Sequence, residues 1–475
     1  MRTEQEYRRR LYSYKRNMFM KGERVGRDHP QFEPAVNLIA ESFRLAVDPG
    51  HADLFAATSH LTGNKINRYN HPPRSVDDLL KKQEATRVLS ARVGGCAFRC
   101  GGVDTLSGLS VVTKEVDEAL GTEYHPRFLK YLQYVQDNDL FTSIHLTDPK
   151  GDRSVRAHQQ VDPDMYLRVV ERKSDGIVVK GAKLFGGTML LDEITVAPTR
   201  AMTDKEGDYA LSFSVPADCD GVAIFCKPVA APTRKQLKAP IATYGLGAET
   251  ITVFDNVFVP WDRVWLCGEW QYAGRASFLI SLFHRSSYTG CKPAVADLFM
   301  GAVAMVAEYN NLERVPHIRE KLAHLAATRE LIFAAGIAGA AKAKPSSSGT
   351  YVPDAVYINA GRYHAGMNIY HEFETLADVS GGQGINLPTE EDFLHPEMGH
   401  YLQKYVKRRP EVPAENIWRL FRLVDDMLYS EQAGWYKAAG LHGGGSPIME
   451  RITILANYDL ESKKKMIKRL AGISD

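Results

Sequence analysis

The pattern of apolar and polar residues changes twice along the chain, and the order of the three patterns constrains the fold more than any other feature. Residues 1–140 contain apolar residues at helical spacing, most clearly over 74–89. Residues 141–275 contain short β-branched and aromatic segments separated by Asp, Gly and Pro. Residues 276–475 are helix-periodic again. We therefore predict an α+β protein with an N-terminal helical domain (1–140), a central antiparallel β domain (141–275) and a C-terminal helix bundle (276–475).

Local signals place the individual elements. Ser75 is expected to cap the first clear helix, because Asp77 and Asp78 follow it in the first turn. The glycine run after His442 has the form of an oxyanion loop found in some esterases. The chain has no G-x-S-x-G nucleophile motif to accompany it, so we expect the run to end a helix instead. We expect helices over 74–89, 128–136, 278–311, 317–344, 355–377 and 414–439, and strands over 178–183, 193–198, 210–215, 221–227 and 250–259.

Charge and hydropathy exclude two classes of partner. The 59 Lys and Arg residues nearly balance the 57 Asp and Glu residues, which argues against nucleic-acid binding. The N-terminus lacks the apolar region of a secretory signal. The longest apolar run, Leu331 to Ala341, is shorter than the roughly 20 residues that span a bilayer. We expect a cytoplasmic protein that binds neither nucleic acid nor membrane.

Cysteine and histidine residues recur at spacings that suggest a shared site. Cys96 and Cys100 are four residues apart and share a face if their segment is helical. His284, Tyr288 and Cys291 lie on one stripe of a predicted helix. Three interpretations compete: buried core residues, a zinc site with three cysteines and one histidine, and an iron–sulfur cluster. Spacing by itself does not decide between them.

Several longer motifs are distributed along the chain. They are ADLFAATSHLTGNKINR, LTDPKGDR, DGIVVKGAK, VFDNVFVPWDRV, HRSSYTGCK and HGGGSP. Through these motifs the chain resembles the 4-hydroxybutyryl-CoA dehydratase branch of the 4-hydroxyphenylacetate 3-hydroxylase flavoprotein family over nearly its whole length. This resemblance implies an acyl-CoA dehydrogenase-like fold with a central antiparallel β-barrel, FAD held between barrel and bundle, and a homotetramer.

The resemblance also implies roles for particular residues. The ligands of a 4Fe-4S cluster match Cys96, Cys100, His284 and Cys291, and the catalytic group matches His284, Glu249, Tyr288 and Lys292. The FAD contacts match Thr147, Asp148, Pro149, Lys150, Asp152, Arg153 and Lys183, together with Ser380, Gly381, Gly382 and Gln383 from a neighbouring subunit. In this family the monooxygenases lack the cluster ligands, so these residues favour the dehydratase branch.

The implied reaction is radical dehydration of a hydroxyacyl-CoA or related substrate, or movement of its double bond. Flavin suits one-electron steps, and an iron site with a displaceable ligand can accept the leaving hydroxyl group. The alternative is a flavin-dependent monooxygenase or oxidoreductase in which the cluster is structural or an electron relay. A third possibility is a non-catalytic homologue that associates with an active one.

Three positions depart from the dehydratase pattern. Ala439 stands where a second glutamate is expected, Phe98 replaces a glutamine between the first two cysteines, and Gly187 replaces a threonine near the flavin. Scaffold and cofactor ligands are kept while the residues expected around the substrate are altered. We therefore predict a paralogue that uses a different substrate or lacks part of the reaction.

Overall fold

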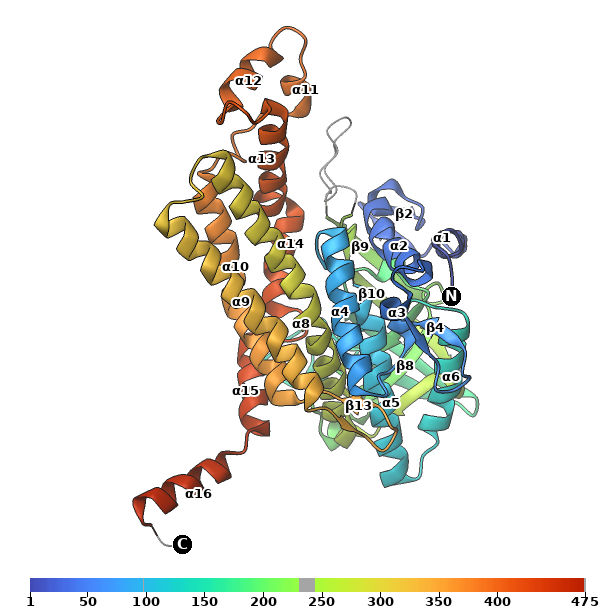
Figure 1. Ribbon diagram of the computed structural model, residues 1–475. Helices are drawn as coiled ribbons and strands as arrows, with labels where there is room; N and C mark the ends of the chain where they lie inside the picture. Colours follow the sequence, from blue (N-terminus) through green and yellow to red (C-terminus); the bar gives the residue numbers. More distant parts are fainter. Residues whose placement is uncertain (97, 230–243, 474–475) are drawn as a thin grey trace.

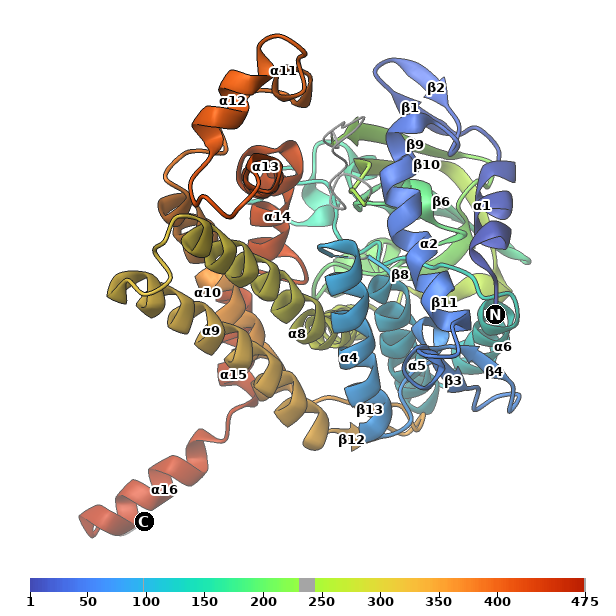
Figure 2. The same cartoon turned by 45° about the horizontal axis from the view of Figure 1, so that its top comes forward.

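The structure is a computed structural model that describes residues 1–96, 98–229 and 244–473. Helices and short strands of the N-terminal part pack beside a β region, and long helices form the other side of the molecule (Figure 1). The last helix projects away from the body, as both views show (Figures 1 and 2). This arrangement agrees with the predicted order of helices, strands and helices.

The N-terminal part contains helices and four short strands. The helices are α1 (Glu4–Ser13), α2 (Glu33–Val47), α3 (Ala52–Phe55), α4 (Val76–Val93), α5 (Cys100–Leu120) and α6 (Tyr124–Asp137). The strands are β1 (Met18–Met20), β2 (Glu23–Val25), β3 (Ala56–Thr58) and β4 (Lys65–Asn67). The predicted cap of α4 is confirmed, since the Asp78 amide donates to Ser75 Oγ at 3.0 Å.

The remaining elements follow the predicted order closely. The strands are β5 (Arg168–Arg172), β6 (Gly176–Leu184), β7 (Glu193–Val196), β8 (Leu211–Pro216), β9 (Val222–Pro228), β10 (Ala248–Pro260), β11 (Val264–Cys267), β12 (Lys344–Pro345) and β13 (Tyr351–Val352). The helices are α8 (Trp270–Tyr309), α9 (Pro316–Ala341), α10 (Ala355–Ser380), α11 (Glu390–Phe393), α12 (Gly399–Val406), α13 (Ala414–Tyr429), α14 (Glu431–His442), α15 (Pro447–Asn457) and α16 (Leu460–Ala471).

The predicted helix over 414–439 is two helices. Ser430 separates them because its backbone is extended, with φ −70° and ψ 162°. Its hydroxyl then caps α14 by accepting from the Ala433 amide at 3.0 Å. The apolar periodicity of the sequence continues across this break, and it therefore predicts one helix where the structure has two.

The β region is not a closed barrel, which corrects that expectation. The described strands form a six-stranded sheet in the order β2-β1-β9-β10-β6-β5 and a three-stranded sheet in the order β11-β8-β7. Between them, the segment before β5 makes only isolated bridges, from His145 to Val196 and from Thr147 to Leu184. A barrel needs continuous pairing between every neighbouring pair of strands, and isolated bridges do not supply it.

The larger sheet also departs from the predicted antiparallel pattern. β1 pairs with β9 in parallel, whereas the other pairings of this sheet are antiparallel. β1 comes from the portion predicted to be helical, and its three residues are too few to show a strand period. A distant segment of the chain therefore completes the sheet.

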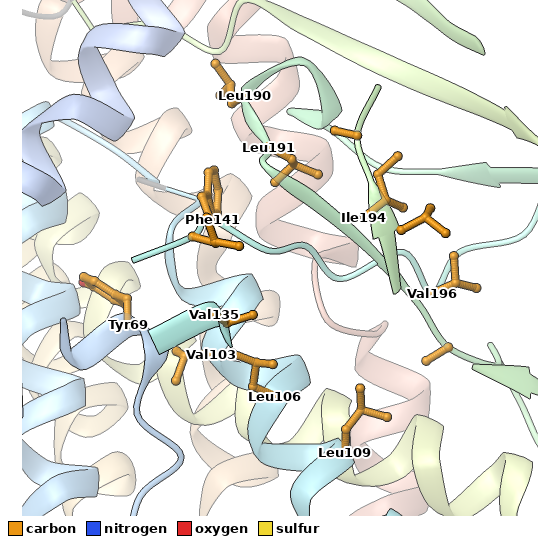
Figure 3. Close-up of a cluster of buried hydrophobic side chains, with 14 of the residues drawn as sticks. Tyr69, Val103, Leu106, Leu109, Val135, Phe141, Leu190, Leu191, Ile194 and Val196 are labelled. Atoms are coloured by element: carbon orange, nitrogen blue, oxygen red, sulfur yellow. The ribbon is translucent and has the colours of Figure 1, made fainter. Parts of the chain in front are cut away.

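Helix α8 connects two hydrophobic cores. The first core contains α5, α6 and β7 side chains, part of which Figure 3 shows, and its α8 members end at Phe283. The second core contains α8 side chains from Phe299 onwards, together with residues of α10 and α13. The segment from His284 to Lys292 therefore lies at the junction of the two cores.

The length and composition of α8 would suit a membrane span. Its most apolar window has a mean hydropathy of 1.4, and 61% of that window is buried within the protein. Packing against α4, α5, α9 and α10 accounts for this apolar character.

Candidate functional site

The four predicted cluster ligands gather where the start of α5 meets the middle of α8. Cys100 is the first residue of α5, and His284 and Cys291 lie in α8. Ligand atoms of Cys100, His284 and the nearby Asp104 all lie within 4.8 Å of one another. The thiols of Cys96, Cys100 and Cys291 are near enough to influence one another's ionisation, and Cys96 also interacts electrostatically with His284. Cys291 Sγ donates to the Tyr288 carbonyl at 3.7 Å. Three thiols and one imidazole therefore lie around the junction of the two cores.

The helical interpretation of the Cys96–Cys100 segment is wrong. α4 ends at Val93, and Gly94 terminates it with a left-handed φ of 71°. Cys96 lies in the non-helical connection before α5. Cys96 and Cys100 therefore do not share a helix face.

Close packing of α4 against α8 fixes the position of the ligands. Pro293 lies inside α8 and provides no amide N–H for the carbonyl of Thr289. The Gln83 side chain on α4 donates to that carbonyl at 3.2 Å instead. A Cβ on Gly290 would meet the Gln83 carbonyl oxygen at 2.3 Å, so glycine permits the close approach of the two helices.

Asp104 holds His284 in a defined orientation. Its fully buried carboxylate contacts His284 Nδ1 at 3.0 Å through Oδ2. Its Oδ1 accepts from Lys82 Nζ at 2.8 Å and from the Ser287 hydroxyl at 2.7 Å. Engaging Nδ1 leaves Nε2 as the nitrogen that can ligate a metal or move a proton.

Sequence reasoning missed Asp104 and Lys82, although a signal was present. Asp104 lies four residues after Cys100, which places both on one face of α5. A carboxylate one turn from a candidate ligand, facing a candidate histidine, is a common arrangement around metal sites.

The three thiols do not ionise alike. The neighbouring Cys291 thiol lowers the pKa of Cys96 to about 7, and the Phe98 backbone amide contributes in the same direction. Burial and the nearby Asp104 raise the pKa of Cys100, while the neighbouring Cys96 thiol and burial raise that of Cys291. Thiolate is the form that ligates a metal, and Cys96 is the one of these three whose pKa is lowered.

Tyr288 and Lys292 face the same junction but are bound to other parts of the bundle. The Tyr288 hydroxyl donates to the Gly440 carbonyl at 3.1 Å, and its ring lies 4.3 Å from the Arg362 guanidinium. Burial raises the pKa of Tyr288. Lys292 is 2% exposed and forms an ion pair with Glu372 on α10. These contacts orient both side chains beside Cys291.

Glu249 lies at the start of β10, opposite Lys227 on β9. The indole N–H of Trp435 on α14 donates to its carboxylate. Burial raises the pKa of Glu249, and the Trp435 hydrogen bond opposes that shift. The structure thus places this predicted catalytic carboxyl group where the β region meets the last helices of the bundle.

The glycine run after α14 lies against His284. α14 ends at His442, which confirms the predicted terminator. Arg362 donates to the Gly443 carbonyl at 3.0 Å, and Arg285 donates to that of Gly444 at 2.7 Å. A Cβ on Gly444, whose φ is +78°, would meet His284 Cδ2 at 2.9 Å. Glycine is therefore needed here for the backbone to approach the histidine.

Replacing Gly444 by alanine is expected to displace His284 and to destabilise the protein. A left-handed alanine costs about 1–2 kcal/mol, and the contact with the imidazole adds to that cost. Gly121→Ala is the matched control, because φ is +70° there and no described atom lies within 4 Å of the added Cβ. Urea unfolding of both variants measures the difference. Equal losses of stability would contradict a contact between Gly444 and His284.

The predicted flavin residues of the β region divide into an ion pair between the buried Lys183 and the half-buried Asp148, and an exposed loop. Lys183 Nζ donates to Asp148 Oδ1 at 2.5 Å and to the Leu146 carbonyl at 2.9 Å. Asp148 also accepts from the Thr199 hydroxyl at 2.6 Å. Pro149 is half-buried, whereas the exposed members of the predicted set are Thr147, Lys150, Asp152 and Arg153.

The segment Ser380–Gln383 begins at the last residue of α10. Gly381 ends this helix with a φ of 61°, and Arg408 donates to Gln383 Oε1 at 2.8 Å. In this chain the segment therefore contacts the connection between α12 and α13. Its approach to the flavin of a neighbouring subunit stays a prediction.

The altered positions Phe98 and Gly187 are neighbours in the fold. Phe98 has a left-handed φ of 57°, and its ring lies 5.2 Å from that of Trp435. A Cβ on Gly187 would lie 4.0 Å from the Phe98 ring. The third altered residue, Ala439, lies in the last turn of α14, where its carbonyl accepts from the Gly443 amide at 2.7 Å.

Sequence models of one family match both parts of the chain. The model described as 4-hydroxyphenylacetate 3-hydroxylase N terminal matches residues 3–266, and the corresponding C-terminal model matches residues 273–472. The chain therefore belongs to the 4-hydroxyphenylacetate 3-hydroxylase family, a family of enzymes.

Comparison with individual relatives places the chain nearer to one branch. It is 35% identical to the 4-hydroxybutyryl-CoA dehydratase/vinylacetyl-CoA-Δ-isomerase of Clostridium aminobutyricum, over 99% of both chains. It is 26% identical to the oxygenase component of 4-hydroxyphenylacetate 3-monooxygenase of Thermus thermophilus, over 98% of this chain and 96% of the other. An oxygen-tolerant archaeal 4-hydroxybutyryl-CoA dehydratase from N. maritimus superposes with a TM-score of 0.95 and 34% identity, covering 100% of this chain and 95% of that one.

Proposed function

We propose that this protein is an FAD- and 4Fe-4S-dependent lyase of the dehydratase type. Its reaction would be dehydration of a hydroxyacyl-CoA or related substrate, with or without double-bond isomerisation. The full-length identity of 35% to a dehydratase/isomerase, against 26% to a monooxygenase, supports this branch. The substrate would be a small molecule, and the relatives' names favour a CoA thioester.

The observation that carries the proposal is that three thiols and one imidazole lie around one junction of the fold, where ligand atoms of Cys100, His284 and Asp104 lie within 4.8 Å of one another. Cys96, Cys100, Cys291 and His284 would hold the cluster, because sulfur-rich donor sets with an occasional histidine suit iron–sulfur centres. Their surroundings fit such a group, since Cys100 and Cys291 are only 5% and 7% exposed. When bound, the two cofactors would supply one-electron chemistry and a Lewis-acidic iron.

The residues of this chain would orient groups and move protons around that centre. Asp104 holds His284 by Nδ1, so Nε2 would be the atom left to ligate the cluster, or to take up a proton when not ligated. Tyr288 and Lys292, beside Cys291, would hydrogen-bond an oxygen of the substrate. Glu249 would act as a second proton-transfer group.

The exposed cations of the 147–153 loop support a phosphate-bearing ligand. Lys150 and Arg153 are exposed and would meet the pyrophosphate of FAD, while the ion pair between Lys183 and Asp148 fixes the base of this loop. Completion of the FAD site by Ser380–Gln383 of a neighbouring subunit would require a homotetramer or another assembly.

Anaerobic purification followed by cofactor analysis and turnover tests the proposal. We expect about four iron and four acid-labile sulfide per chain, together with bound flavin. We also expect loss of water from at least one ester in a panel that includes 4-hydroxybutyryl-CoA, or isomerisation of vinylacetyl-CoA. Bound flavin without iron, and oxygen consumption with reduced flavin and a phenol, would instead establish the monooxygenase alternative. The aromatic pair Phe98–Trp435 is the feature that favours that alternative.

A further inference from the structure

Trp435 connects three parts of the candidate site. Its indole N–H donates to the Glu249 carboxylate at the start of β10. Its ring packs against Phe98, from the connection that carries Cys96, with 5.2 Å between centroids and a tilt of 60°. The next residue, Tyr436, occupies the space where a Cβ on Gly95 would lie. One turn of α14 thus touches both the cysteine connection and the predicted catalytic carboxyl group.

Two adjacent glycines leave room for this arrangement. A Cβ on Gly186 would meet Glu249 Oε1 at 2.7 Å, and a Cβ on Gly187 would lie 4.0 Å from the Phe98 ring. The Glu249 carboxyl group therefore lies between the Trp435 indole on one side and the Gly186 backbone on the other. Its position is defined by neighbours from two separate elements.

Glu249 differs from the other carboxyl groups around the site in its partner. Asp104 and Glu372 each contact a buried lysine, Lys82 and Lys292 respectively. A proton taken up by either of them would break a buried ion pair, which is costly. Within residues 1–96, 98–229 and 244–473, Glu249 receives its hydrogen bond from a neutral indole, and Lys227 acts on it as a nearby charge. Among these three carboxyl groups, Glu249 is the one that has no ion pair with a described residue.

From these contacts we infer that Trp435 is the positioning residue for the Glu249 carboxyl group, and that Phe98 fixes the Trp435 ring in the orientation this requires. The inference deepens the proposed function, on which the proton-transfer role of Glu249 depends. It also connects the altered position Phe98 with the chemistry, because an aromatic residue there braces Trp435. Trp435 itself would not touch the reacting atoms.

Infrared difference spectroscopy of the holoenzyme tests the inference without turnover. A carboxylic-acid band that titrates with pH and is lost in Glu249→Gln reports the protonation of Glu249. In Trp435→Phe the ring remains but the N–H donor is lost, so the charged carboxylate loses a stabilising hydrogen bond. We expect the midpoint of the band to rise by about one to two pH units.

Two further variants make the result specific. Trp261→Phe is the matched control, because it also removes an indole N–H donor. The partner of that donor is the Lys173 carbonyl, at 3.1 Å, and not Glu249. It should leave the midpoint unchanged. Phe98→Leu removes the ring that packs on Trp435 and should raise the midpoint by a smaller amount. It serves as the second measurement if Trp435→Phe does not fold.

Turnover gives the corresponding kinetic signature. With any ester that the wild-type enzyme dehydrates, the acid limb of the kcat/KM profile should shift upward in Trp435→Phe by the same amount as the infrared midpoint. The inference would be overturned if the infrared band had the same midpoint in wild type and in Trp435→Phe. It would also be overturned if Glu249→Gln removed no titrating band from the spectrum. Absence of iron and of dehydration would overturn the proposed function but would not alter the infrared result, so the two failures are distinguishable.

Discussion

The Cys100→Ala variant is expected to lose its iron and its dehydratase activity while remaining folded. Cys100 is the first residue of α5 and lies within 4.8 Å of the His284 ligand atoms. Removal of one of three thiolates leaves too few ligands to hold a cluster, so iron should fall from about four per chain to below about one. Loss of a residue that only hydrogen-bonds to a metal ligand already lowers metal affinity or activity by about 10–100-fold. Removal of a ligand itself should therefore lower iron binding and activity by more than this.

A second buried cysteine supplies the control for this experiment. Cys226 lies in β9, is 8% exposed and has no part in the proposed cluster. Cys226→Ala should therefore retain iron, sulfide and activity. Retention of iron and activity in Cys100→Ala would show that these thiols are ordinary core residues, and the proposed lyase would lose its main support.

The Lys292→Met variant is expected to destabilise the protein by about 3–5 kcal/mol. Lys292 and Glu372 form a buried ion pair whose side chains are 3% and 1% exposed. Removal of the lysine leaves the Glu372 charge buried without its partner. Among the described residues, the second oxygen of this carboxylate, Oε1, already lacks a hydrogen bond. A lower urea midpoint for unfolding, measured on protein of matched cofactor content, checks this expectation.

The double variant Lys292→Met/Glu372→Leu separates structure from catalysis. Replacement of a buried ion pair by apolar side chains of similar volume is often neutral, so most of the lost stability should return. Activity should not return if Lys292 also contacts the substrate, as we propose. Recovery of both stability and activity would assign Lys292 a purely structural role, and failure to recover stability would contradict the ion-pair explanation.

Much of the secondary structure could be predicted because it depends on local signals. Neighbouring residues in the sequence are enough to predict the helical and β-rich segments. They also predict the Ser75 cap and the end of α14 at His442. The break at Ser430 was missed because the apolar pattern runs through it, while the extended backbone that interrupts the helix leaves no periodic trace. The predicted domain boundaries stay predictions.

The candidate site could be predicted in its ligands but not in its supporting contacts. Cys96, Cys100, His284 and Cys291 stood out by residue type and by family resemblance. Their partners are separated from them in sequence, as in the bonds from Gln83 to the Thr289 carbonyl and from Trp435 to Glu249. A single sequence contains no signal for such pairings unless they fall on one helix face, as Cys100 and Asp104 do.

The sequence by itself therefore determined the order of the long helices and the main strands, which thiols and imidazole are available, and which positions depart from the dehydratase pattern. Only the tertiary structure decided that the described sheets stay separate, that Cys96 lies in a non-helical connection, and that the Trp435 indole donates to Glu249. The physical reason is the range of the interactions. Capping and periodicity act within a few residues, whereas sheet closure, buried ion pairs and ligand geometry depend on contacts between segments that only packing brings together.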